Sequence, residues 1–254
     1  MVNNTKHLEI LYSDDSIVAV NKPAGLLTLP DRFKSELPNV RGLLIEKFGE
    51  IFTVHRLDKA TTGVILFART AEAHKNLNTQ FQQHSILKVY HGIVSGVVEN
   101  DEMDIDIPIA EDTTRKGLMR PTARGKNSLT KIKVTERFKI ATLLECKPIT
   151  GRQHQIRVHL AAIGHPLLVD VDYGTLTEFM LSTIKRRFKL AKETTERPLL
   201  SRTPLHAYSL TFVHPDTNEI QTISAEYPKD IRATLQALRK YSVYVSYSSD
   251  EYFY

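Results

Sequence analysis

The chain has 254 residues, of which 41% are hydrophobic and 25% charged, as is ordinary for a globular protein with a substantial core. Its formal net charge of +5 modestly favours a polyanionic partner. A single cysteine, Cys146, excludes an intramolecular disulfide framework. No apolar run approaches the roughly 18 residues of a membrane span, and the polar start does not resemble a signal peptide. The sequence therefore predicts a soluble, cytoplasmic protein.

Strand-like runs dominate the chain. Apolar runs predict strands at residues 17–20, 64–67, 90–94, 129–134, 142–146, 209–213 and 219–224. Apolar residues spaced about one helical turn apart predict helices over residues 71–83, 153–163 and 229–239. Residues 214–219 predict a hairpin turn between the last two strands. Strands and helices mix without a βαβ rhythm, which predicts an α+β fold with a largely antiparallel sheet.

Two basic stretches interrupt this pattern. Residues 111–127 carry five basic side chains with Gly and Pro, which predicts a long loop or a hairpin. The second stretch, residues 178–197, contains the run 185–192 with five more. Such runs are often only solvated faces, but clustered Lys and Arg are also what a phosphate-binding rim needs. The Tyr- and Ser-rich tail, residues 241–254, is expected to form an edge strand or a disordered end.

Residues 55–63, with the sequence HRLDKATTG, are the most informative stretch. They place Asp58 two residues after Arg56 and lead directly into the apolar run 64–68, so that a polar loop is anchored on a buried strand. Such an anchor can hold a catalytic carboxylate still. Judged by spacing alone, a surface ion pair between Arg56 and Asp58 is the more common explanation.

The same stretch resembles the signature of the RluA-type pseudouridine synthases. Five further stretches resemble other motifs of that family, in the family's order: residues 21–25, 88–90, 150–160, 164–170 and 205–207. The resemblance implies one catalytic domain over residues 8–230, with a mixed, mostly antiparallel sheet flanked by helices and loops. A C-terminal helix and tail would follow at residues 231–254. Because the motifs begin near Leu8, no separate N-terminal RNA-binding domain is expected.

The resemblance also implies a catalytic site. In the family the aspartate that corresponds to Asp58 is the catalytic residue, and it acts on the sugar, on the base or as a proton acceptor. A buried carboxylate needs a cation to stay ionised, and the family supplies one from the segment that contains Arg152 and Arg157. We expect Arg157, which lies deeper in the predicted helix, to pair with Asp58; the alternative is that both arginines only solvate the helix. The tyrosine that corresponds to Tyr90 stacks on the target base.

A uridine inside folded RNA must leave its stack before it can react. Arg56 is planar and close to Asp58, so it is expected to fill the resulting gap or to bind phosphate. The expected RNA contacts are Arg56, Arg152, Lys88, Lys22, Lys185, Arg186 and Arg187.

The histidines are expected to be structural. No carboxylate or cysteine stands at metal-ligand spacing from His154, His159, His165 or His206. His55 is expected to hold its own loop by a hydrogen bond, with the two threonines and the glycine of residues 61–63 as further support. The chain has neither a P-loop nor a dinucleotide fingerprint, so no metal and no other cofactor is expected.

The predicted function is therefore the isomerisation of specific uridines in structured rRNA or tRNA to pseudouridine, on a flipped-out base. One alternative is an RNA-binding protein that keeps the fold without catalysis, although an inactive site should show gaps among Asp58, Tyr90 and the arginines. The other is an acid–base hydrolase that uses Asp58 and a histidine, for which no nucleophile–base spacing is visible. The sequence leans slightly to tRNA and does not indicate an oligomeric state.

Overall fold

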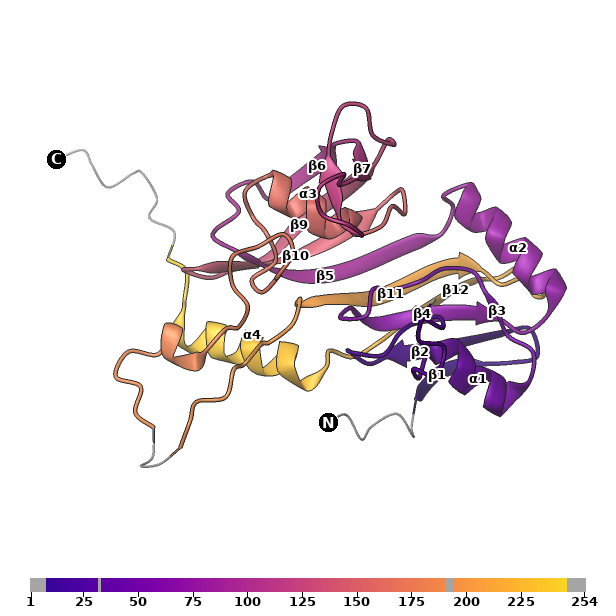
Figure 1. The fold of residues 1–254 in the computed structure, drawn as a ribbon, viewed down its shortest axis with the longest axis horizontal. Coiled ribbons are helices and arrows are strands. Elements are labelled where there is room, and N and C mark those ends of the chain that lie inside the picture. The colour runs from indigo at the N-terminus through magenta and orange to yellow at the C-terminus, as the bar shows by residue number, and fades with distance from the viewer. Residues whose placement is uncertain (1–7, 32, 191–193, 246–254) are drawn as a thin grey trace.

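The computed structural model of the chain describes residues 8–31, 33–190 and 194–245. Its main sheet contains the strands β1 (Glu9–Ser13), β2 (Ile17–Lys22), β3 (Phe52–Thr53), β4 (Thr62–Ala68), β5 (Leu87–Ser95), β6 (Glu102–Asp106), β9 (Leu129–Arg137), β10 (Ala141–Pro148), β11 (Leu205–Val213) and β12 (Ile220–Ser224). The helices are α1 (Val40–Phe48), α2 (Ala71–Gln82), α3 (Gln155–Ala162) and α4 (Lys229–Tyr241). The strand order is β1–β2–β4–β11–β5–β10–β9–β6, with β3 beside β4 and β12 beside β11 (Figure 1).

Neighbouring strands of the sheet pair antiparallel, except for β4 and β11, which pair parallel. The predicted α+β fold with a mixed, mostly antiparallel sheet is thus confirmed. Each strand and helix predicted from the sequence overlaps an observed element, and residues 214–219 join β11 to β12 as a hairpin.

Helices cover both faces of the sheet. On one face α2 packs against β2 and β4 through Leu77, and α4 packs against β5 and β10 through Leu235. On the other face α1 packs through Leu44 and α3 through Leu160. Strand β4 is therefore covered on both sides and all seven of its residues are buried, which explains the continuous apolar run 64–68.

Helix α4 belongs to the core of this domain. Leu235 and Leu238 share an apolar cluster with Ile93 of β5 and Leu143 of β10. The expected boundary at residue 230 therefore does not separate this helix from the domain. Beyond α4 the chain makes an isolated antiparallel bridge between Val243 and the segment after β9, and residues 246–254 of the tail lie outside the described residues.

The two basic stretches have different structures. Within and beside residues 111–127, β7 (Ile109–Glu111) and β8 (Met119–Pro121) form a separate two-stranded hairpin, which was one of the two expected forms. In the second stretch, residues 185–190 follow a short 3-10 turn, η1 (Leu181–Thr183), and lie beside α4 (Figure 1). The Lys185 ammonium there lies over the rings of Phe188 and Tyr241. Residues 191–193 lie outside the described residues.

The sequence pattern did not reveal helix α1. It contains Gly42, and its apolar residues do not form a clear stripe. The helix begins because the Asn39 side chain accepts a hydrogen bond from the Gly42 amide at 2.8 Å, and it ends at Gly49, whose amide donates to the Ile45 carbonyl. None of the helices in the described part of the chain has the length and apolar character that a membrane crossing requires.

Gly63 fixes the point where β4 meets β11. Its φ is +107°, and a Cβ atom built on it would lie 2.1 Å from the Ala207 carbonyl oxygen. Only glycine fits such a backbone angle and such a close approach. The parallel pairing of Gly63 with Ala207 thus depends on the absence of a side chain.

We expect Gly63→Ala to lower the free energy of unfolding by more than about 4 kcal/mol, or to prevent folding, because β4 and β11 must separate to admit the methyl group. Gly49→Ala is the matched control. It also has a positive φ, of +82°, but open space around its Cβ position, so only the backbone cost of about 1–3 kcal/mol applies. Urea unfolding followed by circular dichroism measures both, and equal losses would contradict the close approach.

Candidate active site

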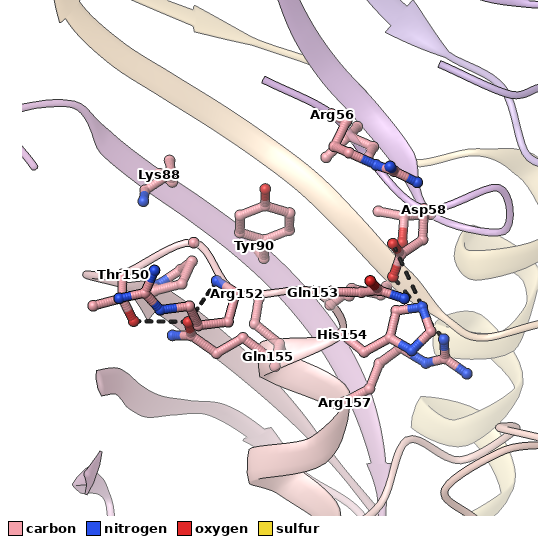
Figure 2. A pocket seen from close by; sticks show the side chains of 16 residues that line it. Arg56, Asp58, Lys88, Tyr90, Thr150, Arg152, Gln153, His154, Gln155 and Arg157 are labelled. Atoms are coloured by element: carbon pink, nitrogen blue, oxygen red, sulfur yellow. Dashed lines mark hydrogen bonds and ion pairs between the residues drawn. The ribbon is translucent and has the colours of Figure 1, made fainter. Parts of the chain in front are cut away.

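A pocket of about 200 Å³ lies where the loop before β4 faces the start of α3 and one side of β5. Its walls come from segments far apart in the sequence, and Figure 2 shows Asp58, His154 and Arg157 on one side of it and Arg152 on another. The volume is below the ~300–1,000 Å³ typical of drug-sized sites, so it suits a single planar ring better than a large ligand.

The loop that carries Asp58 is held by the loop after β2. The Thr28 hydroxyl donates to the Leu57 carbonyl at 2.9 Å and accepts from the Leu57 amide at 3.2 Å. The Gly25 amide donates to the Lys59 carbonyl at 2.8 Å. These bonds fix the backbone on both sides of Asp58.

Lys22 also holds the loop that carries Asp58. Its side chain is fully buried, and its Nζ donates to the backbone carbonyls of Pro23 at 2.9 Å, Leu26 at 2.7 Å and Lys59 at 3.1 Å. Burial, followed by the charge of Arg202, lowers the pKa of Lys22 to about 7. The structure gives no support to the expected RNA contact by Lys22, because its side chain is buried and its Nζ bonds to backbone carbonyls.

Arg157 directs one guanidinium nitrogen at Asp58. Its Nε and Nη2 donate to the two oxygens of the buried Asp170 at 2.7 and 2.6 Å, and Nη2 also donates to Asp172 at 2.6 Å. The remaining nitrogen, Nη1, lies 4.0 Å from Oδ2 of Asp58, whose side chain is 27% exposed (Figure 2). The two other aspartates thus orient the guanidinium toward the pocket.

The Arg157 charge is secure. Burial by itself lowers the pKa of Arg157, but the hydrogen bonds and charges of Asp170 and Asp172 outweigh burial and raise this pKa above its ordinary value. The guanidinium therefore stays protonated although it is largely buried.

Arg152 lies elsewhere in the pocket wall. Its Nε donates to the Asn127 carbonyl at 3.3 Å, and its backbone amide donates to the Gln155 side chain at 3.0 Å. Gln155 also accepts from the Thr150 hydroxyl at 2.7 Å, which shapes the loop before α3. Of the two candidate arginines, the structure brings only Arg157 within ion-pair distance of Asp58 (Figure 2).

His154 is a member of the site that sequence reasoning missed. It precedes α3 in the left-handed conformation, with φ +53°, and its Nε2 lies 3.8 Å from Oδ1 of Asp58. Its Nδ1 lies 2.9 Å from the Tyr173 hydroxyl. Burial lowers the pKa of His154, so the ring is neutral at neutral pH. The predicted helix began at residue 153, and a helical His154 would have pointed elsewhere.

Tyr90 and Lys88 extend from β5 into the pocket, and the exposed Arg56 lies at its edge (Figure 2). Burial, with the charge of Asp58, raises the pKa of Tyr90 well above its ordinary value, so its hydroxyl stays protonated. Burial also lowers the pKa of Lys88 to about 8. These three side chains surround the volume that a substrate ring would occupy.

Four of the other histidines have internal partners. His55 accepts from the Leu66 amide at 2.9 Å, His206 lies 2.8 Å from the Thr62 hydroxyl, and His159 and His165 contact backbone carbonyls. Among the described residues, no group of His, Cys, Asp and Glu side chains is arranged to hold a metal ion.

Residues 16–162, more than half of the chain, match the family described as RNA pseudouridylate synthase. The chain belongs to this family. The chain is 34% identical to the dual-specificity RNA pseudouridine synthase RluA of Haemophilus influenzae, over 87% of this chain and 93% of that protein. It is 36% identical to the large-subunit pseudouridine synthase C of Escherichia coli K12, over 91% of this chain and 70% of that protein. These relatives support the RluA-type branch of the family.

Longer relatives match as well. The chain is 35% identical to the large-subunit pseudouridine synthase D of Neisseria meningitidis serogroup B over 91% of its own length, but it spans only 61% of that protein. The solved structure of human RNA pseudouridylate synthase domain containing 4 is 25% identical, with a TM-score of 0.69, and the match covers 91% of this chain and 93% of the human one.

Within this family fold, four of the six segments that resemble family motifs line one pocket: residues 55–63, 88–90, 150–160 and 205–207. Asp58, Tyr90, Arg157, Arg56, Arg152 and Lys88 all line it. The basic residues Lys185, Arg186 and Arg187 do not; they lie in the stretch beside α4 (Figure 1). The structure therefore gives no support to an RNA contact by these three residues next to the pocket.

We expect Arg157→Met to lower the free energy of unfolding by about 3–5 kcal/mol, because it leaves the buried carboxylate of Asp170 without its cation. Arg152→Met is the matched control. This replacement also removes a guanidinium from the region of α3, but it breaks only one weak side-chain hydrogen bond. The free energy of unfolding should therefore change by less than about 0.5 kcal/mol. Chemical denaturation measures both, and similar values would show that the Arg157–Asp170 pair does not hold this wall together.

Proposed function

We propose that this chain isomerises specific uridines in structured RNA to pseudouridine, with Asp58 as the catalytic carboxylate. The observation that carries the proposal is the position of Asp58, partly exposed on the wall of a ring-sized pocket and facing Nη1 of Arg157 at 4.0 Å. The reaction breaks the bond between N1 of uracil and C1′ of ribose, turns the base and joins C1′ to C5. The proton on C5 is lost and N1 gains one, so the products balance without an oxidant or reductant.

Three side chains around Asp58 have distinct parts in this proposal. The target base must leave its stack, and the exposed guanidinium of Arg56 can take its place in the RNA or bind an adjacent phosphate. The Tyr90 ring offers a stacking surface for the extruded base. The guanidinium of Arg157 places a positive charge 4.0 Å from the Asp58 carboxylate.

The substrate class follows from charge and from the relatives. Arg56, Lys88 and Arg152 place positive charge around the pocket, where RNA phosphates would approach. The relatives are named large-subunit rRNA synthases and a dual-specificity synthase, which supports rRNA or tRNA as the substrate. The cytoplasmic location expected from the sequence agrees with such a substrate.

An inactive RNA-binding protein of the same fold is the alternative. Nothing at the pocket favours it, since Asp58, Tyr90 and Arg157 are all present and all face the same volume. A site that has lost its chemistry is under no constraint to keep this arrangement.

We expect Asp58→Asn to lower pseudouridine formation by at least about 10²–10⁴-fold, because the amide cannot carry the negative charge of a catalytic carboxylate. Transcribed tRNA and large-subunit rRNA fragments serve as substrates, and nucleoside analysis by mass spectrometry measures the product. Asp104→Asn is the matched control; this exposed aspartate pairs with Lys131 on the sheet and does not line the pocket, so full activity is expected.

The outcome separates the two functions. Product from the wild type and from Asp104→Asn but not from Asp58→Asn supports the enzyme. RNA binding by all three without product supports the inactive alternative, and equal product from all three contradicts the role of Asp58.

We expect Tyr90→Phe to retain more activity than Tyr90→Ala. Stacking of a base on an aromatic ring is worth about 1–3 kcal/mol, so loss of the ring should lower the rate about 5- to 150-fold. Phenylalanine keeps this ring and its fit in the pocket wall. The single-turnover rate on the same RNA measures the difference, and a Phe variant as slow as the Ala variant would show that the hydroxyl matters more than the ring.

A further inference from the structure

His154 occupies a position that the proposed chemistry does not yet explain. Of the four described non-glycine residues with a positive φ, it alone lines the pocket. A left-handed conformation disfavours a residue with a Cβ and persists only where surrounding contacts enforce it. In His154 this conformation turns the ring back from the start of α3 toward Asp58 (Figure 2).

The hydrogen bonds of Tyr173 determine which nitrogen of His154 carries the proton. The Tyr173 hydroxyl accepts a hydrogen bond from the Met119 backbone amide at 2.8 Å. Its own proton then needs an acceptor, and the one in reach among the described residues is Nδ1 of His154 at 2.9 Å. A neutral histidine that accepts at Nδ1 must carry its proton on Nε2.

The surroundings of Nε2 are consistent with this tautomer. Nε2 faces Oδ1 of Asp58 at 3.8 Å, so an N–H group, and not a lone pair, points at the carboxylate. Nη1 of Arg157 faces the other oxygen, Oδ2, at 4.0 Å. The two carboxylate oxygens of Asp58 therefore each have their own donor, one neutral and one charged.

We propose that His154 is a positioning residue for Asp58, and that Tyr173 holds it in the Nε2–H tautomer that this role requires. The inference rests on the proposed function. Both distances exceed those of formed hydrogen bonds, and catalytic hydrogen bonds commonly shorten when substrate closes the site. With RNA bound, the two donors fix the plane of the carboxylate against the reacting ring.

Tyr173 is itself fixed by the groups that orient Arg157. Its backbone amide donates to Oδ1 of Asp170 at 3.2 Å, and the Arg157 guanidinium lies 4.8 Å from the centre of its ring. One buried carboxylate, that of Asp170, thus sets the direction of both donors to Asp58. Burial raises the pKa of Tyr173, so its hydroxyl remains available to donate.

The first test needs no substrate. Nitrogen-15 spectra of histidine-labelled protein distinguish the two neutral tautomers, and we expect His154 in the Nε2–H form. Tyr173→Phe should shift His154 toward a mixture of tautomers, because the acceptor role of Nδ1 is lost. An Nδ1–H form in the wild type, or no change in Tyr173→Phe, overturns the inference whether or not the chain is an enzyme.

The second test uses an RNA that the wild type converts, either a transcribed tRNA or a large-subunit rRNA fragment. We expect His154→Asn and Tyr173→Phe each to lower the single-turnover rate at saturating enzyme about 10- to 100-fold, with RNA affinity changed less than about twofold. Asparagine tolerates the left-handed backbone but is too short to reach both partners. Because the residues act in series, the double variant should be no slower than His154→Asn.

Tyr227→Phe is the matched control. Its hydroxyl also contacts a histidine Nδ1, that of His91, but neither residue lines the pocket, so an unchanged rate is expected. If the wild type forms no pseudouridine on any of these RNAs, the proposed function is wrong. An active wild type with unaffected His154→Asn and Tyr173→Phe variants, or with losses that simply multiply in the double variant, removes the positioning role alone.

Discussion

The buried ion pair between Arg157 and Asp170 is the interaction on which the pocket depends. Removing two charges from water costs several kcal/mol for each ion, and the attraction between them offsets this only when the geometry is good. Here the guanidinium fork meets both carboxylate oxygens, and the same carboxylate accepts the backbone amides of Asp172 and Tyr173. The pair therefore joins α3 to the turn over residues 170–173 and sets the orientation of both groups that face Asp58.

This arrangement gathers three carboxylates around a single guanidinium at and behind one wall of the pocket. One guanidinium serves three carboxylates, those of Asp58, Asp170 and Asp172, while the neutral His154 adds a dipole but no charge. The positive side chains Arg56, Lys88 and Arg152 line other parts of the pocket. A phosphate group is thus attracted to the part of the pocket that these side chains line.

The sequence predicts those parts of the molecule that depend on local patterns. A strand buried on both faces, such as β4, is visible as an apolar run, and the motif segments name Asp58, Tyr90 and Arg157 without coordinates. Other features follow from tertiary contacts. Three backbone carbonyls bind the buried Lys22 ammonium, and a left-handed backbone angle, which helical periodicity does not reveal, sets the orientation of His154. Asp170 is part of a motif, but only its bond to Arg157 explains why a carboxylate stands there.

The site is also divided between two parts of the sheet, and strand β11 connects them. Asp58 precedes β4, whereas Tyr90 comes from β5, and β11 lies between these strands, paired parallel with one and antiparallel with the other. Ala207 of β11 is in register with both Gly63 and Tyr90, so the distance across the pocket is set by two adjacent strand spacings of about 4.8 Å each. Because a glycine at position 63 permits the contact between β4 and β11, the backbone of the sheet sets the separation of the pocket walls.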